Sequence, residues 1–373
     1  MKVLLTATVQ SHICQFHKAL VEVLHEHGCE VHVAARDNLA EKNGLKLDFV
    51  EKVYDVPFSR SPKSKENIKA YKQLKKIINA GEYDVIHCNT PMGGIVTRLA
   101  AQKARKRGTQ VFYTAHGFHF YKEAPKKNWL VFYPIEKLFS RLTDKLITIT
   151  QEDYELASKK FHCPVYRIHG VGVDEKRYFP ADAQMKSELR KKLGYTDDQK
   201  LILCIGELLP NKNQSMAICM MKELVKEFPN AKLLLAGNGP ERENLEALIE
   251  KLGLQEHVEL LGYCTYLEKY QKSVDLAVSC SKREGLPLNV VESMLSCTPV
   301  VVSQNRGHRE LIQNEKTGFI VNVNDFNAMF EKIVNIIRQE EVKETIAGKA
   351  YIYALDYGFK SVKRELDKIY YPV

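Results

Sequence analysis

The 373-residue sequence lacks several features that mark particular protein classes. No apolar run approaches the roughly 18 residues that a membrane-spanning helix needs. The nine cysteines are odd in number and never form a Cys-x-x-Cys pair, so their spacing argues against a disulfide framework and against a zinc site. Hydrophobic residues make up 45% and charged residues 27%, which excludes wholesale disorder, a collagen-like repeat and a coiled-coil rod. We therefore expect a folded, cytoplasmic protein without a metal ion.

Positive charge is concentrated in the first half of the chain. The net charge is +9, and residues 1–170 carry 27 Lys and Arg against 17 Asp and Glu. Lysines and arginines gather over residues 63–76, 103–107 and 126–127. This half favours an anionic partner, such as an acidic ligand or the inner face of a membrane, although solvated helix faces would also explain the runs. Nucleic acid is disfavoured, because the runs lack interleaved aromatic residues and a recognisable binding module.

Short β-rich runs alternate with helical patterns along the chain. The predicted strands span residues 2–8, 31–35, 85–89, 110–116, 145–150, 165–169, 201–206, 232–237, 258–261, 276–280, 299–303 and 319–321. The amphipathic stretches between them include residues 65–80, 94–107 and 129–142. Buried strands that are each followed by a helix are typical of parallel sheets covered on both faces. More than eight strands argue against a single (β/α)₈ barrel.

The length and a glycine pair predict two tandem domains. A chain of this length exceeds the roughly 250–300 residues at which one hydrophobic core stops growing. Gly170 and Gly172 directly follow a predicted strand, which suits a hinge, and the charge balance changes there. We expect two doubly wound, Rossmann-like α/β domains that face each other across a cleft, over residues 1–170 and 171–355. Residues 356–373 are expected to form a helix that packs on the first domain.

Unusual polar residues follow the predicted strands. In open parallel sheets, ligands bind outside the carboxyl ends of the strands. The loops at those positions contain Ser11-His12, His116-Gly117, Glu207 to Asn213, Gly237-Asn238-Gly239, Arg283-Glu284-Gly285 and Arg306-Gly307-His308-Arg309. We expect all six to line a ligand site.

The stretch from Ser281 to Met294 is the most informative one. Gly285 allows a tight turn after a strand, and a helix is predicted to begin near Leu288. Free N–H groups at such a helix start hold phosphate well. Glu284 before the helix and Glu292 within it would then reach different parts of one ligand. A helix-dipole carboxylate and a solvated loop residue explain the same spacing about equally well.

The sequence at this point resembles the retaining glycosyltransferases of family 4, which have the two-domain GT-B fold. Glu284 and Glu292 match the E-x₇-E signature of that family within EGLPLNVVES. Further matches occur in the family's order: Thr114-Ala115-His116-Gly117, Val173-Asp174 with Phe179-Pro180, Gly206 with Lys212-Asn213, Leu235 to Pro240, and Thr317-Gly318-Phe319. The segments SHICQFH, HGFHFY and KREGLPLNVVE resemble bacterial exopolysaccharide and capsule glycosyltransferases in particular.

The resemblance implies a role for each matched residue. Lys212 would neutralise the departing diphosphate, Glu284 would position the transferred sugar, and His116 would line the sugar pocket from the first domain. On the donor side, the resemblance implies that Glu292 contacts the ribose and that the amides near Leu288 and Asn289 contact phosphate. The other donor-binding residues that it implies are Gly206, Arg283 and Gly285. A front-face retaining route is implied, in which the leaving phosphate helps to deprotonate the acceptor.

Two positions depart from the family pattern. Glu207 stands where the family has a basic residue, so one phosphate cation is missing, and Arg283, Arg306 or Arg309 is a candidate to replace it. For Arg306 and Arg309 a solvated surface loop is an equal alternative. The first loop lacks the family's paired glycines, and we expect its Ser11 and His12 to contact the acceptor. A polar residue at a helix start is the alternative for His12.

The remaining signals limit the function further. His17 stays undecided, and His25, His27, His32, His87, His162 and His169 are expected to be packing or surface residues. Because no Asp-x-Asp occurs, we expect neither a metal nor another cofactor. The predicted function is transfer of a hexose or N-acetylhexosamine from a nucleotide-linked donor, with UDP expected, to a lipid-linked or growing glycan at the inner membrane face. The alternatives are a catalytically silent regulatory homologue that binds a nucleotide sugar, and a UDP-sugar 2-epimerase.

Overall fold

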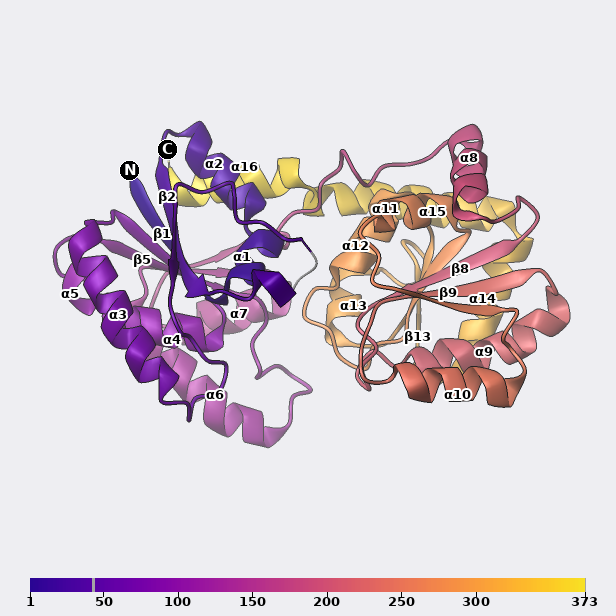
Figure 1. Cartoon of the computed structure of the whole chain (residues 1–373), viewed down its shortest axis with the longest axis horizontal. Coiled ribbons are helices and arrows are strands. Elements are labelled where there is room, and N and C mark those ends of the chain that lie inside the picture. Colours follow the sequence, from indigo (N-terminus) through magenta and orange to yellow (C-terminus); the bar gives the residue numbers. More distant parts are fainter. Residues whose placement is uncertain (42–43, 373) are drawn as a thin grey trace. The chain divides into compact units, whose positions relative to one another are not determined.

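Each half of the chain contains one parallel sheet whose strands alternate with helices (Figure 1). The computed structural model describes residues 1–41 and 44–372. Its contacts divide the chain into unit 1, Met1–Gly172 with Phe359–Val373, and unit 2, Val173–Gly358. Within the described residues, no helix combines the length and apolar character that crossing a membrane requires.

Unit 1 has a seven-stranded sheet in the order β3-β2-β1-β4-β5-β6-β7. Its strands are β1 (Lys2–Val9), β2 (Glu30–Arg36), β3 (Lys52–Asp55), β4 (Val85–Asn89), β5 (Gln110–Ala115), β6 (Lys145–Thr148) and β7 (Val165–Arg167). Its helices are α1 (Gln10–Phe16), α2 (Lys18–Glu26), α3 (Glu66–Gly81), α4 (Pro91–Ala100), α5 (Gln102–Arg105), α6 (Lys126–Phe139), α7 (Gln151–Lys160) and α16 (Phe359–Tyr370), with short 3₁₀ turns at Leu39–Glu41 and Ser140–Leu142.

Unit 2 has a six-stranded sheet in the order β10-β9-β8-β11-β12-β13. Its strands are β8 (Lys200–Ile205), β9 (Ala231–Ala236), β10 (Val258–Gly262), β11 (Leu276–Ser279), β12 (Val300–Ser303) and β13 (Phe319–Val321). Its helices are α8 (Ala183–Leu193), α9 (Gln214–Glu227), α10 (Arg242–Leu252), α11 (Leu267–Ser273), α12 (Leu288–Leu295), α13 (Arg306–Leu311), α14 (Phe326–Arg338) and α15 (Glu340–Ala354), with a 3₁₀ turn at Leu355–Tyr357.

The apolar strands are buried because helices cover both faces of each sheet (Figure 1). In β9, Leu233 packs into one core cluster with Met216 of α9 and Met329 of α14. The next residue, Leu234, points to the other face and joins a second cluster with Val291 of α12. Successive side chains of a strand alternate between faces, so a strand of continuous leucine serves two cores at once.

The strand orders place a switch point in each sheet. The order reverses between β1 and β4 in unit 1 and between β8 and β11 in unit 2. Loops from such neighbouring strands diverge to opposite faces and leave a crevice at the carboxyl ends. The segments after β1, β8 and β11 therefore have the positions at which a ligand is expected.

The chain returns to unit 1 through α16, which lies beside α2 (Figure 1). Tyr370 Oη lies 2.5 Å from His87 Nδ1 in the core. On the surface, Glu365 pairs with His169, at 2.6 Å between Oε1 and Nδ1, and Lys363 reaches Glu22 of α2 at 3.1 Å. Unit 1 is thus built from both ends of the sequence.

Candidate functional site

The loops that follow β8 and β11 are joined by hydrogen bonds. The Lys282 amide donates to the Asn211 carbonyl at 2.8 Å, and Asn211 Nδ2 donates to the Arg283 carbonyl at 2.9 Å. Asn213, whose φ of 56° lies in the left-handed region, donates from Nδ2 to the Cys280 carbonyl at 3.3 Å. Asparagine tolerates that conformation better than most residues. The two loops are therefore fixed relative to each other at the switch point of the sheet.

Lys212 and Glu284 form an ion pair between these loops. Lys212 Nζ lies 2.5 Å from Glu284 Oε1, and the two side chains are 23% and 13% exposed. The aliphatic part of Lys212 passes close to Gly206, where an added Cβ would lie 3.3 Å from Lys212 Cδ. The structure thus brings Glu284 together with Gly206 and Lys212, which belong to a different motif of the sequence, and it leaves the ion pair partly exposed.

The amino end of α12 lies beside this pair. α12 begins at Leu288, as predicted, and among the described residues no side chain caps it. The amides of Val290 and Val291 point back to the Pro287 carbonyl, at 3.1 and 3.4 Å. Asn289 Nδ2 donates to the Ile205 carbonyl at the end of β8, at 2.9 Å, which ties the helix start to the loop of Lys212. An uncapped helix start with a lysine nearby is a favourable site for phosphate oxygens.

Glu292 lies one turn further along α12 and is held by side chains of other elements. Its Oε2 accepts a hydrogen bond from Gln271 Nε2 of α11 at 3.2 Å, and Tyr178 donates a second one. Burial raises the pKa of Glu292 to about 7, against the lowering effects of Tyr178, Gln271 and Arg177. Nothing in the sequence pattern marked Tyr178 or Gln271, since both reach Glu292 only through the tertiary fold.

The start of α13 packs closely against Glu284. A Cβ added to Gly307 would lie 2.8 Å from Glu284 Cβ and 2.6 Å from the Gly285 carbonyl oxygen, so only glycine allows this approach. His308 is fully buried, between the Ser303 carbonyl and Ser279 Oγ, and burial lowers its pKa to about 4. Arg306 is 7% exposed, so the surface-loop interpretation is wrong for this residue. Arg309, Arg283 and Glu207 are exposed.

The glycines after β9 have a packing role. A Cβ at Gly237 would lie 2.0 Å from the Gly206 carbonyl oxygen, and one at Gly239 would lie 2.4 Å from that of Leu208. The amide of Leu208 donates to the Asn238 carbonyl at 2.9 Å. These glycines let the β9 loop support the segment that carries Lys212.

In unit 1, the predicted residues gather at the carboxyl ends of β1 and β5. His116 directly follows β5, and its Nε2 lies 3.2 Å from His12 Nε2 and 3.3 Å from Asn89 Oδ1 of β4. The expectation that Ser11 and His12 lie in a loop is wrong, because α1 already begins at Gln10. Ser11 Oγ accepts a hydrogen bond from Asn38 at 2.9 Å, so it also fixes the chain after β2.

A cavity of about 550 Å³ opens beside His12. Its lining includes Ser11, Phe16, Arg60, Phe118 and Phe132. Most of this surface is apolar, while Arg60 and His12 supply polar groups. Such a mixture suits an amphipathic ligand with one anionic or hydroxylated end.

The polar residues predicted for the site thus form two groups. Unit 2 brings Lys212, Glu284 and the start of α12 together, with Glu292 one turn away. Unit 1 brings His12 and His116 together. The first group lies at the switch point between β8 and β11, and the second lies at the carboxyl ends of β1 and β5.

Both halves match known families of proteins. Residues 185–352 match the family described as glycosyl transferases group 1, and residues 2–150 match the family described as glycosyl transferase 4-like. EpsD of Bacillus subtilis (strain 168), for which a glycosyltransferase activity is proposed, is 38% identical over 372 residues, 99% of this chain and 96% of its own length.

A more distant relative and a solved structure extend this similarity. The Escherichia coli UDP-Gal:alpha-D-GlcNAc-diphosphoundecaprenol alpha-1,3-galactosyltransferase is 27% identical over 342 residues, 89% of this chain and 86% of its own length. The crystal structure of Anabaena HepE in complex with UDP and glucose superimposes with a TM-score of 0.78 over the full length of both chains, at 20% identity.

Proposed function

The chain belongs to the glycosyl transferases of group 1 and has the GT-B fold, and from this premise we propose that it is a retaining transferase that uses a UDP-linked hexose or N-acetylhexosamine. The acceptor in this proposal is a lipid-linked or growing glycan of surface polysaccharide synthesis. EpsD, the Escherichia coli enzyme with its UDP-Gal donor and diphosphoundecaprenol-linked acceptor, and the UDP complex of HepE support these choices.

The observation that carries the proposal is the Lys212–Glu284 pair beside the uncapped start of α12. The diphosphate of the donor would rest on the amides of Leu288 and Asn289 and attract Lys212 Nζ. Glu284 would then exchange the ammonium group for hydroxyls of the transferred sugar. The positive helix end and Lys212 stabilise the charge that develops as the sugar–phosphate bond breaks, which is the main requirement of this reaction.

Glu292 is the proposed ribose ligand. Its hydrogen bonds to Gln271 and Tyr178 fix the orientation of the carboxyl group. An ionised carboxylate accepts hydrogen bonds from both hydroxyls of a ribose, and bound ribose would therefore favour the ionised form of a group whose pKa is raised to about 7.

Unit 1 supplies the acceptor side in this proposal. His116 would contact the transferred sugar, and Ser11 and His12 would contact the acceptor at the cavity that His12 lines. The acceptor hydroxyl would attack from the face that the diphosphate leaves, with a phosphate oxygen taking its proton. We propose that this route needs no metal ion, because the helix start and Lys212 supply the positive charge.

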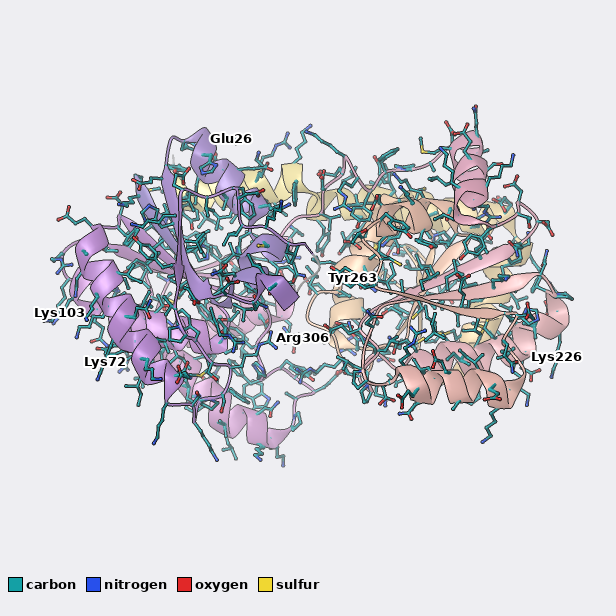
Figure 2. The ribbon with its side chains drawn as sticks, in the orientation of Figure 1. Glu26, Lys72, Lys103, Lys226, Tyr263 and Arg306 are labelled. Carbon is teal, nitrogen blue, oxygen red and sulfur yellow. The ribbon has the colours of Figure 1, made fainter. Side chains whose placement is uncertain are left out.

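A peripheral contact with an anionic membrane is part of the proposal. Unit 1 is basic, and Lys72 and Lys103 extend from its surface (Figure 2). α6 adds an apolar face, with Leu130 78% and Leu138 59% exposed, next to Lys126 and Lys127 at its start. Exposed leucine flanked by lysine is the pattern of a helix that lies in a membrane interface.

Sedimentation with anionic phospholipid vesicles at low salt tests this contact. Wild-type protein should pellet with the vesicles, and L130S/L138S should pellet less. Ile352→Ser in unit 2 is the matched control, because Ile352 is 69% exposed and should leave binding unchanged. Equal binding of all three proteins, or none, would remove the membrane contact from the proposal.

The activity itself is tested by incubating the protein with a panel of UDP-sugars and lipid-linked acceptors and analysing the products by mass spectrometry and NMR. Transfer with retained anomeric configuration, lost in Glu284→Gln, is the expected result. Donor binding without turnover would instead identify the silent regulatory homologue. Release of an epimerised sugar without an acceptor would identify the 2-epimerase. If the protein is a transferase, its activity with each donor and acceptor is expected to be insensitive to EDTA.

A further inference from the structure

Three imidazole rings converge at the carboxyl ends of β1 and β5. His12 lies in α1, His17 follows its last residue, and His116 follows β5. Each offers a ring nitrogen within 4.8 Å of those of the other two. The ring centroids are 4.5 Å apart for His12 and His116, and 5.4 Å apart for the two pairs that include His17.

Not every ring nitrogen of these three histidines has a hydrogen-bond partner in the part of the chain that the structure describes. His17 is 3% exposed, and among the described residues no atom forms a hydrogen bond with its Nε2. The Nε2 atoms of His12 and His116 face each other at 3.2 Å, where a direct bond requires one to donate and the other to present a lone pair. A buried polar atom without a partner is costly, so a ligand that accepts nitrogen lone pairs would stabilise the group.

The neighbouring His87 shows the contrasting arrangement. It is also buried, but its Nδ1 lies 2.5 Å from Tyr370 Oη and its Nε2 lies 2.6 Å from Thr114 Oγ1. Both of its ring nitrogens are engaged, so His87 serves packing, as the sequence predicted. The unsatisfied nitrogen of His17 is therefore not a general consequence of burial in this region.

We propose that His12, His17 and His116 bind one divalent transition-metal ion of the zinc type. Three imidazoles with a fourth position left for water or another oxygen are a common zinc ligand set, with Zn–N distances of about 2.0–2.1 Å. Tetrahedral geometry at those distances separates ligand nitrogens by about 3.4 Å. The Nε2 atoms of His12 and His116, 3.2 Å apart, already lie near that separation, and the nitrogen that His17 offers lies within 4.8 Å of both ligand atoms.

The surroundings favour imidazole as a metal ligand. Burial lowers the pKa of His12 and of His17 well below the ordinary value, and the other imidazoles add to this effect. Burial likewise lowers the pKa of His116 to about 4. These shifts all favour the neutral imidazole, which is the form that coordinates a metal. Asn89 Oδ1 lies 3.3 Å from His116 Nε2 and would lose this contact when that nitrogen coordinates the ion.

A bound ion would act on the transferase reaction through His116. This consequence rests on the proposed function, in which His116 contacts the transferred sugar. An ion that engages the His116 ring removes this contact, so Zn²⁺ is expected to inhibit transfer. The site is distinct from the diphosphate-binding residues, which belong to unit 2.

The binding test uses the full chain with no nucleotide sugar present, so its result does not depend on the proposed function. Titration of reduced protein with Zn²⁺ against a chromophoric chelator should give one ion per chain with micromolar or tighter Kd. Co²⁺ should give the visible bands of a tetrahedral site with nitrogen ligands. A thiolate-to-cobalt charge-transfer band would instead assign the ion to cysteine and overturn the proposal.

Variants locate the site. His17→Ala and His12→Ala should each weaken Zn²⁺ binding at least tenfold, while His162→Ala, which removes an exposed imidazole of the same unit, should leave it unchanged. If His17→Ala does not fold, as judged by circular dichroism, His12→Ala decides the matter, since its ring lies at the cavity. No binding by the wild type, or equal binding by His12→Ala, would refute the site. Binding without inhibition of transfer would keep the site and contradict the role of His116 in the reaction.

Discussion

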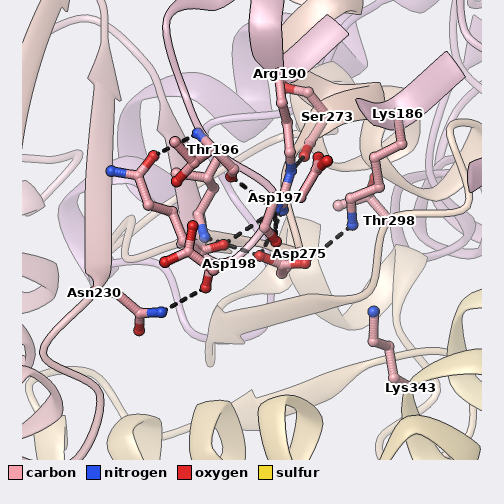
Figure 3. A network of polar contacts seen from close by, with 12 residues as sticks. Lys186, Arg190, Thr196, Asp197, Asp198, Asn230, Ser273, Asp275, Thr298 and Lys343 are labelled. Atoms are coloured by element: carbon pink, nitrogen blue, oxygen red, sulfur yellow. Dashed lines mark hydrogen bonds and ion pairs between the residues drawn. The ribbon is translucent and has the colours of Figure 1, made fainter. Parts of the chain in front are cut away.

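Two groups of ion-paired side chains lie at opposite ends of the neighbouring strands β8 and β11. At the amino ends, Asp275 precedes β11 and pairs with Arg190 at 2.7 Å and with Lys186 at 3.0 Å (Figure 3). At the carboxyl ends, Lys212 pairs with Glu284. Each end of these two strands thus carries a cluster of acidic and basic side chains. The two clusters differ in how many of their charged atoms have a partner within the protein.

In the amino-end cluster, the charged atoms of Arg190 and Asp275 are bonded to other protein atoms. Arg190 is 3% exposed and also donates to the carbonyls of Ser273, Asp197 and Gln199, at 2.8, 3.0 and 3.0 Å (Figure 3). Burial alone would raise the pKa of Asp275, but Lys186, Arg190 and the Leu201 amide hold it below its ordinary value. The Lys212–Glu284 pair, by contrast, lies on two loops beside an uncapped helix start. An ion pair whose donors all point to protein atoms holds the fold together, whereas an open pair can exchange partners with a ligand.

The largest expected effect is a loss of stability when the amino-end cluster is broken. Arg190→Met should lower the free energy of unfolding by about 3–5 kcal/mol, because it removes the guanidinium partner of the buried Asp275 carboxylate and leaves three carbonyls without this donor. Urea unfolding at neutral pH measures the change. A loss below about 1 kcal/mol would mean that this cluster is no more structural than a surface pair.

Substitution in the Lys212–Glu284 pair should affect activity rather than stability. Glu284→Gln is expected to lower kcat by about 10²-fold, the cost of displacing the reacting sugar by about 1 Å. Its free energy of unfolding should change by less than about 1 kcal/mol, since Lys212 keeps access to solvent. Glu315→Gln, at a side chain that is 62% exposed, is the control for both measurements. A variant that transfers sugar at the wild-type rate would contradict the role of Glu284.

Glu292 is expected to show an intermediate, pH-dependent effect. Its pKa is raised from the ordinary 4.5 to about 7 by burial, so the folded protein binds this proton more tightly than the unfolded chain. The stabilisation from that proton is complete below pH 4.5 and is lost as the pH rises to about 7. Glu292→Gln should therefore be more stable than the wild type at pH 8, by roughly 1–3 kcal/mol, and should approach it at pH 5.

Urea unfolding at both pH values checks this prediction. Glu246→Gln is the matched control, because Glu246 lies on the exposed face of α10, 47% accessible. It should show the same small difference from the wild type at pH 5 and at pH 8. A pH-independent difference for Glu292→Gln would show that its pKa is not raised in the folded state.

The smallest effect is expected at a surface pair. Arg242 Nε lies 2.9 Å from Glu246 Oε1, one turn along α10, and the two side chains are 44% and 47% exposed. Arg242→Ala should change the free energy of unfolding by less than about 0.5 kcal/mol, because solvent screens the pair. A change as large as that of Arg190→Met would remove the distinction between buried and exposed ion pairs in this protein.

The sequence was sufficient to predict most of the fold because its strands are apolar and uninterrupted. The run Leu201–Ile205 lies within β8 as expected. β3 was missed because Lys52–Asp55 is short, charged and lies at the edge of its sheet, where one side needs no apolar cover. Ser11 and His12 were taken for loop residues, whereas α1 already begins at Gln10, directly after β1.

The sequence predicted those residues of the candidate site that lie within one local segment. Glycine, glutamate and a helix start within one short segment identified the region from Glu284 to Glu292, and resemblance to a family added Lys212. Tyr178 and Gln271 were missed because they meet Glu292 only after three distant segments have folded. The convergence of His17 with His116 has the same cause, since 98 residues, including several strands of the sheet, lie between them in the sequence.

The return of α16 to unit 1 has a consequence for how the protein is made. Synthesis releases the strands of unit 1 first, but His87, His169 and Glu22 must wait for partners that leave the ribosome only after Gly358. Unit 2 is continuous, so it can finish folding while unit 1 is still exposing the surface that α16 will cover. The first unit to be translated is therefore the last to be completed, and until then the apolar surface that α16 covers stays exposed to solvent.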